Sequence, residues 1–268
     1  MDPFEDGAKF QIARTLYALD LHRQFLQKME KWLLLMSRER TNFTYDLEPN
    51  NLNHLAGFVA LVSSVPLAQA EKYVGELAAC DLLKEVVRDV TRQTDLRFVG
   101  DAEARPGRRI GWYALVRAHR SKCVVELGVD KGLGSCILAE ALRRNRDEGH
   151  PGRLYAIDIN PDAGLLLRAS EYAEFGEFIA SDSIAFMQSF PGAIDLLVSD
   201  SDHSAEYEER EYEAARPKMA ADSVIIADNA HATDMLYRYA KRYCKRFLFY
   251  HERPLNHIYP GAGIGACF

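Results

Sequence analysis

Beyond about residue 110, the hydrophobic positions form short apolar runs that alternate with amphipathic helical patterns. The runs hold four to six residues, many of them β-branched, and polar residues or glycines bound them, which is typical of buried strands. The expected strands are 123–127, 154–159, 177–180, 194–199 and 223–227, and the expected helices are 111–120, 135–144, 162–175, 183–189, 205–219 and 233–243. This alternation predicts an α/β fold with a mostly parallel sheet covered by helices on both faces.

The end of the chain departs from this alternation. Residues 246–251 and 263–268 both have strand patterns, and only residues 253–262 separate them. A parallel crossover needs a dozen or more residues, so the two strands are expected to pair antiparallel as a C-terminal hairpin.

The N-terminal part of the chain has helical patterns and no strand pattern. Residues 8–40 have apolar side chains at helical spacing over an unusually long stretch, and shorter helices are expected over 52–62, 67–77 and 79–92. A connection containing Gly and Pro follows over residues 95–109. We therefore expect an N-terminal helical region over residues 1–100 and an α/β domain over residues 101–268.

Composition narrows the functional classes. The 268 residues are 48% hydrophobic, enough for a packed core, and carry a formal net charge of −6. An acidic chain is a poor general binder of nucleic acid or anionic membranes. The five cysteines form no C-x-x-C pair, and neither a signal peptide nor a membrane-spanning run is visible. We expect a cytoplasmic protein with a small-molecule partner and with neither nucleic acid nor membrane as partner.

The most informative motif is the turn that follows the first expected strand. Gly128, Gly132 and Gly134 have the spacing G-x-x-x-G-x-G, and a helix begins at once after them, near Ser135. Glycines are needed where backbone angles exclude a Cβ or where the backbone must approach a ligand closely. The alternative is a purely structural turn.

Polar residues follow the next two strands, at the edge of the sheet where ligands of such folds bind. Asp158, beside Ile159, can accept hydrogen bonds from both hydroxyl groups of a ribose, or it can cap the next helix. Asp182, beside Ser183, can accept a hydrogen bond from an adenine amino group, or it can be the N-cap of the helix that follows.

The fourth and fifth strands end in a second group of oxygen donors. Asp200 follows one, Asp228 and Asn229 follow the other, and neighbouring strands would bring the three together. Hard oxygen ligands suit Mg²⁺ or another divalent cation. Ordinary turn chemistry is the alternative explanation for each residue alone.

The glycine loop after an acidic residue resembles motif I of the class I S-adenosylmethionine (SAM) methyltransferases. More narrowly, residues 108–268 resemble the cation-dependent O-methyltransferases of the catechol, caffeoyl-CoA and antibiotic sugar types, through Glu126-Leu127-Gly128, Asp200 and Asp228-Asn229. The resemblance implies a Rossmann-like sheet, SAM as cofactor and a divalent cation held by Asp200, Asp228 and Asn229. The residues implied or suggested to bind the cofactor are Glu126, Gly128, Gly132, Gly134, Ser135, Asp158, Ile159, Asp182, Ser183 and Asp200.

His203 is the candidate catalytic residue. In the catechol and caffeoyl-CoA enzymes a lysine three residues after the first metal-binding Asp acts as general base, and here that position is His203. Near neutral pH a histidine can take the proton of a hydroxyl group. The alternative is a polar residue at the start of a helix. His231 lies near the same rim and is not assigned a role.

The resulting hypothesis is a SAM-dependent O-methyltransferase that acts on a hydroxylated small molecule. The N-terminal helices would cover the pocket, set acceptor choice or pair two subunits as a homodimer. An RNA methyltransferase using the basic helix 233–243, and a catalytically silent SAM-binding interaction protein, are the alternatives. For Arg105, Arg108 and Arg109 a surface role is expected ahead of contact with an anionic substrate.

Overall fold

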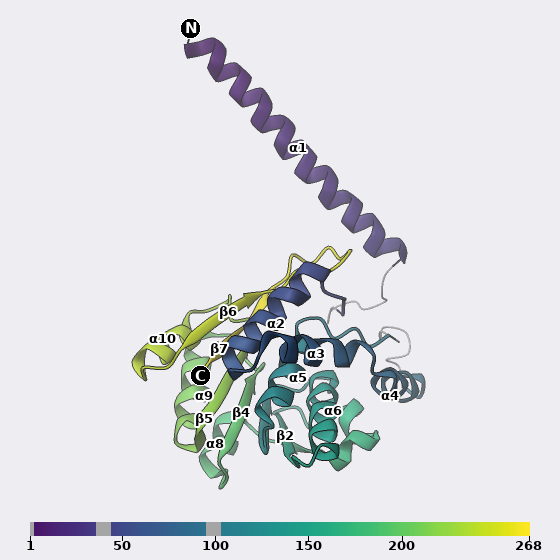
Figure 1. Ribbon diagram of the computed structural model, residues 1–268, viewed down its shortest axis with the longest axis vertical. Helices are drawn as coiled ribbons and strands as arrows, with labels where there is room; N and C mark the ends of the chain where they lie inside the picture. The colour runs from purple at the N-terminus through teal and green to yellow at the C-terminus, as the bar shows by residue number, and fades with distance from the viewer. Residues whose placement is uncertain (1–2, 36–43, 95–102) are drawn as a thin grey trace.

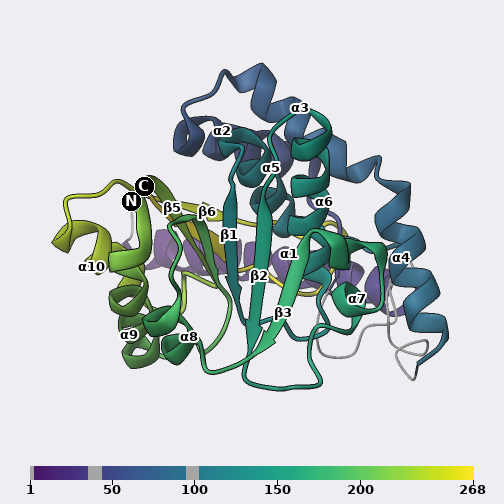
Figure 2. The same cartoon turned by 90° about the horizontal axis from the view of Figure 1, so that it is seen from below.

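The computed structural model describes residues 3–35, 44–94 and 103–268, and a seven-stranded sheet lies at its centre (Figures 1 and 2). The strands are β1 Cys123–Leu127, β2 Arg153–Asp158, β3 Gly176–Ala180, β4 Ile194–Ser199, β5 Met219–Asp228, β6 Phe247–His251 and β7 Gly263–Cys267. Their order in the sheet is β3-β2-β1-β4-β5-β7-β6. The predicted Rossmann-like sheet is confirmed.

The C-terminal hairpin is also confirmed. Strands β1 to β5 pair parallel, whereas β7 lies between β5 and β6 and pairs antiparallel with both. The parallel pairing of β4 with β5 brings their carboxyl ends to the same edge of the sheet. This adjacency places Asp200 near Asp228.

Each face of the sheet has its own apolar core, because successive side chains of a strand point to opposite faces. In β1, Val124 packs in one core and Val125 in the other. Figure 2 shows helices on both faces. The first face is covered by α2 Pro49–Ser63, α3 Leu67–Ala78, α4 Asp81–Arg92, α5 Arg109–His119, α6 Leu133–Asp147 and α7 Leu165–Arg168, and the second by α8 Ser183–Ser189, α9 Ala205–Ala215 and α10 Met235–Arg242.

The N-terminal helices behave in two ways. Helices α2 and α3 pack against α5 and share its core, and Leu47 pairs with Pro254 of the segment between β6 and β7. Helix α1, Pro3–Leu35, instead projects from the body of the protein (Figure 1). The predicted end of this helix at residue 40 and the predicted boundary near residue 100 lie outside the described residues. Over the three described ranges, no helix combines the length and apolarity that crossing a membrane requires.

Two predicted helices extend several residues beyond the observed ones. The expected helix over 162–175 is wrong: only α7 and a 3₁₀ turn at Glu171–Glu174 form there. Gly164 has a φ of +72° and lies next to the Phe178 ring, so the chain turns before α7 begins. The expected helix over 205–219 ends as α9 at Ala215, and a 3₁₀ turn containing Pro217 follows it, because proline has no backbone N–H for a helical hydrogen bond.

Candidate active site

A cavity of about 680 Å³ opens at the carboxyl ends of β1 to β4. This is where ligands bind in parallel α/β sheets. Eight of the ten predicted cofactor-binding residues line it: Glu126, Gly128, Gly134, Asp158, Ile159, Asp182, Ser183 and Asp200. Gly132 and Ser135 are outside the lining.

The glycine loop lies in closer contact with its neighbours than side chains would allow. Gly128 has a φ of +87°, and a Cβ there would lie 2.0 Å from the carbonyl oxygen of Asp200. A Cβ on Gly134 would lie 2.4 Å from the Glu126 Oε1 atom. Gly132 precedes α6 with a φ of +94° and is needed for the turn itself. The loop can therefore lie this close to its neighbours only with glycine at these positions.

Glu126 presents a buried carboxyl group to the cavity. Burial raises its pKa to about 8, against the opposing effect of a hydrogen bond from the Ser135 hydroxyl. Ser135 itself is fully buried and donates to Glu126 Oε2. In this structure Ser135 therefore positions Glu126 from behind the cavity wall.

Asp158 connects the end of β2 to the glycine loop. Its Oδ2 atom accepts hydrogen bonds from the backbone N–H groups of Val129 at 2.8 Å and Asp130 at 3.1 Å, and Oδ1 accepts from Asn160 N at 2.8 Å. Each carboxylate oxygen can accept more than one bond, so the group can still face a ribose. The role that sequence reasoning did not anticipate is the anchoring of the loop.

Asp182 is the N-cap of α8, which was the alternative to adenine binding. It accepts hydrogen bonds from Ala185 N at 2.9 Å and from the Tyr207 hydroxyl at 2.8 Å, and these bonds lower its pKa. Ser183 donates to Glu211 Oε1 at 2.5 Å. Both residues also line the cavity, so capping and ligand contact are compatible.

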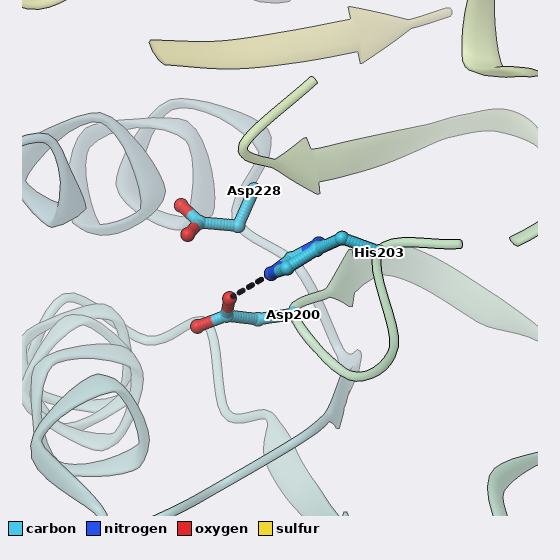
Figure 3. A group of neighbouring side chains, drawn as sticks. All are labelled: Asp200, His203 and Asp228. Atoms are coloured by element: carbon cyan, nitrogen blue, oxygen red, sulfur yellow. Dashed lines mark ion pairs between the residues drawn. The ribbon is translucent and has the colours of Figure 1, made fainter. Parts of the chain in front are cut away.

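The ends of β4 and β5 bring three titratable side chains together (Figure 3). Ligand atoms of Asp200, His203 and Asp228 all lie within 4.8 Å of one another, and His203 Nε2 is 3.6 Å from Asp200 Oδ1. Burial and the charge of Asp228 raise the pKa of Asp200 well above its ordinary value. The third predicted ligand, Asn229, lies beside His203, with its Nδ2 atom 3.1 Å from His203 Nε2.

The other side of the His203 ring faces a buried acid. Nδ1 lies 3.9 Å from Glu208 Oε1, and the Thr233 hydroxyl donates to the second oxygen of Glu208. The Glu208 carboxylate raises the pKa of His203. Burial of the ring lowers this pKa, whereas the negative charge of Asp228 raises it, and the net effect is a raised pKa. His231, by contrast, is exposed.

The expected surface role is wrong for Arg108. Its guanidinium group is buried and donates to both carboxylate oxygens of Asp228, with Nε at 2.5 Å from Oδ1. Nη1 donates to the Tyr45 hydroxyl at 2.9 Å and to Glu252 Oε1 at 3.1 Å. Burial raises the pKa of Asp228, but the charge and hydrogen bonds of Arg108 lower it by more, so that the pKa lies below its ordinary value.

Nothing local in the sequence identifies Arg108 as the partner of Asp228, because 120 positions separate the two residues. The neighbouring arginines differ from it. Arg109 lines the cavity, and Arg105 Nε lies 3.4 Å from Asp46 Oδ2.

Residues 125–230 match a family described as a methyltransferase domain. No curated protein matches the chain. Its fold is similar to that of the O-methyltransferase TomG from Streptomyces achromogenes, solved with SAM, at 14% identity and a TM-score of 0.52, over 74% of this chain and 93% of that one.

Two further solved structures are similar. Cofactor-bound Rv0187 from MTB has 15% identity and a TM-score of 0.56, over 72% of this chain and 92% of that one. The O-methyltransferase from Bacillus cereus, in complex with SAH, has 16% identity and a TM-score of 0.50, over 72% and 93% of the two chains. The shared fold confirms the Rossmann-like sheet expected from the sequence, and the domain match over residues 125–230 agrees with the expected methyltransferase.

Proposed function

We propose that this protein transfers the methyl group of SAM to a hydroxyl group of a small molecule, with His203 as general base. The observation that carries the proposal is the cavity at the carboxyl ends of β1 to β4, with the paired His203 and Glu208 next to one of its lining residues, Asp200. Similarity to two solved structures named as O-methyltransferases supports transfer to oxygen.

The residues around the cavity suit SAM. Its volume lies within the usual range for small-molecule sites, roughly 300 to 1,000 Å³. Gly128 and Gly134 would let the backbone approach the amino-acid end, near the Glu126 carboxyl group, and Asp158 would hold the ribose. When bound, SAM supplies a reactive methyl group, and the protein contributes binding and orientation.

His203 would remove the proton of the acceptor hydroxyl. A carboxylate beside Nδ1 favours a proton on that nitrogen and leaves the lone pair on Nε2, the atom that faces Asp200 and Asn229. Glu208 would hold the ring in this orientation and stabilise the protonated form that results. Such proton transfer contributes typically about 10²- to 10⁴-fold in rate.

The predicted Mg²⁺ or other divalent cation at Asp200, Asp228 and Asn229 stays a prediction, and its ligand set suits such an ion poorly. Asp228 is fully buried, and both of its oxygens accept hydrogen bonds from Arg108. The Asn229 side chain contacts His203, with Nδ2 3.1 Å from Nε2. We therefore derive no step of the reaction through a metal ion.

Calorimetry with SAM and variants of Asp158 tests the cofactor site. Asp158→Ala should weaken SAM binding strongly, because it removes both the ribose acceptor and the anchor of the glycine loop. Asp162→Ala, an exposed aspartate in the same turn, is the matched control and should bind SAM normally. Tight binding of NAD without binding of SAM would contradict the proposal.

The two alternatives make different predictions. An RNA methyltransferase using the basic helix would need it beside the cavity, and no residue of α10 is among those that line it. A silent binding protein would bind SAM but release no S-adenosylhomocysteine with any hydroxylated acceptor. Cytoplasmic location and a homodimer through the N-terminal helices stay predictions.

A further inference from the structure

We propose that the guanidinium group of Arg108 takes the place of a divalent cation at the ends of β4 and β5, so that this protein works without a metal ion. The inference rests on the proposed O-methyltransferase function. Arg108 is then a positioning residue, which acts through its hydrogen bonds to Asp228 and through its permanent positive charge.

The first support is the geometry of the pair. Arg108 donates through Nε and Nη2 to the two oxygens of Asp228, the bidentate arrangement in which a planar guanidinium group matches a carboxylate best. The Asp228 side chain is 0% exposed and that of Arg108 11%. A cation could bind Asp228 only by displacing these bonds or by sharing its oxygens with them.

The second support is that Arg108 is held independently of Asp228. Its Nη1 atom donates to Tyr45 and to Glu252, and Tyr45 itself donates to Glu252 Oε2 at 2.7 Å. Glu252 also accepts a hydrogen bond from Ala262 N at 2.8 Å. The segment before α2 and both ends of the β6–β7 connection therefore fix the guanidinium group, and movement to admit an ion would disrupt several bonds.

The third support is electrostatic. An ion bound to an Asp228 oxygen at the usual 2.0 to 2.6 Å or so would lie within a few ångströms of Arg108, with no water layer to screen the repulsion. An arginine cannot relieve that repulsion by losing its proton. The Asp228 carboxylate of this cluster thus already has its positive counter-charge.

Electron paramagnetic resonance with Mn²⁺ tests the inference on the wild-type protein and needs no acceptor. We expect no Mn²⁺ site of sub-millimolar affinity in the wild type. Arg108→Gln, which removes the charge and keeps hydrogen-bonding groups, should bind Mn²⁺ at least about tenfold more tightly than the wild type. Arg108→Lys, which keeps the charge, should not.

The double variant Arg108→Gln with Asp228→Asn is the control, and it should lose the Mn²⁺ site that Arg108→Gln creates. A wild-type Mn²⁺ site that Asp228→Asn abolishes would overturn the inference, and so would a folded Arg108→Gln variant without increased Mn²⁺ affinity. If Arg108→Gln fails to fold, the wild-type titration still decides. Calorimetry of SAM binding to the wild-type protein, once with EDTA and once with Mg²⁺, separates the two proposals. Absence of SAM binding under both conditions counts against the methyltransferase function. SAM binding with Mg²⁺ but not with EDTA counts against metal independence.

Discussion

The His203 imidazole lies between a buried acid and the wall of the cavity, and this position is what makes it a candidate base. Glu208 on one side and Asp200 on the other approach different ring nitrogens, at 3.9 and 3.6 Å. A histidine that only began a helix would need neither contact. The arrangement resembles a base held by an orienting carboxylate, a common form of acid–base machinery.

Replacement of His203 by alanine tests its role as base. We expect His203→Ala to lower turnover by about 10² or more and to leave SAM affinity nearly unchanged, because proton removal matters in the transition state and not in cofactor binding. His231→Ala, at an exposed histidine beyond the end of β5, is the matched control and should keep normal turnover. Release of S-adenosylhomocysteine at saturating SAM is the measurement. Near-normal turnover of His203→Ala would contradict the role of His203 as base and would favour the alternative, a polar residue at the start of a helix.

The pH dependence of turnover tests the partner of His203. A base works in its deprotonated form, and Glu208 raises the pKa of His203 above its ordinary value of 6.5. Turnover should therefore fall on the acid side at a pH above 6.5. Glu208→Gln should move this acid limb to lower pH, because the neutral amide no longer stabilises the protonated ring. Glu209→Gln, at the neighbouring half-buried glutamate that accepts a hydrogen bond from Arg242, should leave the profile in place. An unchanged limb in Glu208→Gln would show that Glu208 does not set this pKa.

The turn between β1 and α6 forms part of the cavity wall, and contacts with the neighbouring strands hold it in place. Gly128 touches the backbone of Asp200 at the end of β4, and Asp158 at the end of β2 holds the loop through two backbone N–H groups. The loop is thus fixed to the two strands that flank β1. Its conformation follows from these backbone contacts, and glycine is required where the contacts are shortest.

Gly128→Ala tests this requirement, and Gly149→Ala is a closely matched control. Both glycines have a φ of +87°, but a Cβ on Gly149 would meet nothing within 4 Å, whereas one on Gly128 would meet the Asp200 backbone. Gly149→Ala should cost about 1–2 kcal/mol of left-handed strain, or a few degrees in Tm. Gly128→Ala should lower Tm clearly further and abolish SAM binding. Equal Tm losses with intact SAM binding in both variants would contradict the close-approach argument.

The whole molecule has one feature that its α/β body does not explain, the projecting helix α1. Phe10, Leu16 and Leu19 are 60–70% exposed, and several other large apolar side chains of α1 are also exposed. Extended apolar surface of this kind marks interaction sites in water-soluble proteins. The sequence-based expectation that the N-terminal helices pair two subunits is the simplest way to cover it.

We therefore predict a homodimer that depends on α1. Leu16→Glu with Leu19→Glu should give a monomer in light scattering, because each substitution would bury a charge in an apolar contact. Gln11→Glu with Gln27→Glu adds the same charge at polar positions of α1 and should leave the dimer intact. A wild-type protein that is monomeric at high micromolar concentration would refute this prediction.

Much of the fold and part of the site could be predicted from the sequence, because both depend on short-range constraints. Strands β1, β4 and helix α8 were predicted at their observed bounds, since apolar runs and glycine or capping residues act within a few positions. The glycine loop and the carboxylates at the ends of β2 and β4 were identified for the same reason. The helix expected over 162–175 failed because the left-handed turn at Gly164 fits against Phe178, a contact visible only after folding.

Tertiary structure decided how the charges at the site are paired. The sequence predicts Asp228 as a metal ligand because its position at the end of β5 is local information, whereas its guanidinium partner comes from a residue 120 positions away. Asp182 likewise gains a hydrogen bond from the Tyr207 hydroxyl through the packing of α8 against α9. Sequence periodicity determines which strand ends carry carboxylates. The three-dimensional packing determines which positive charge, proton or backbone N–H group each one meets, because electrostatic partners are selected by distance in space and not along the chain.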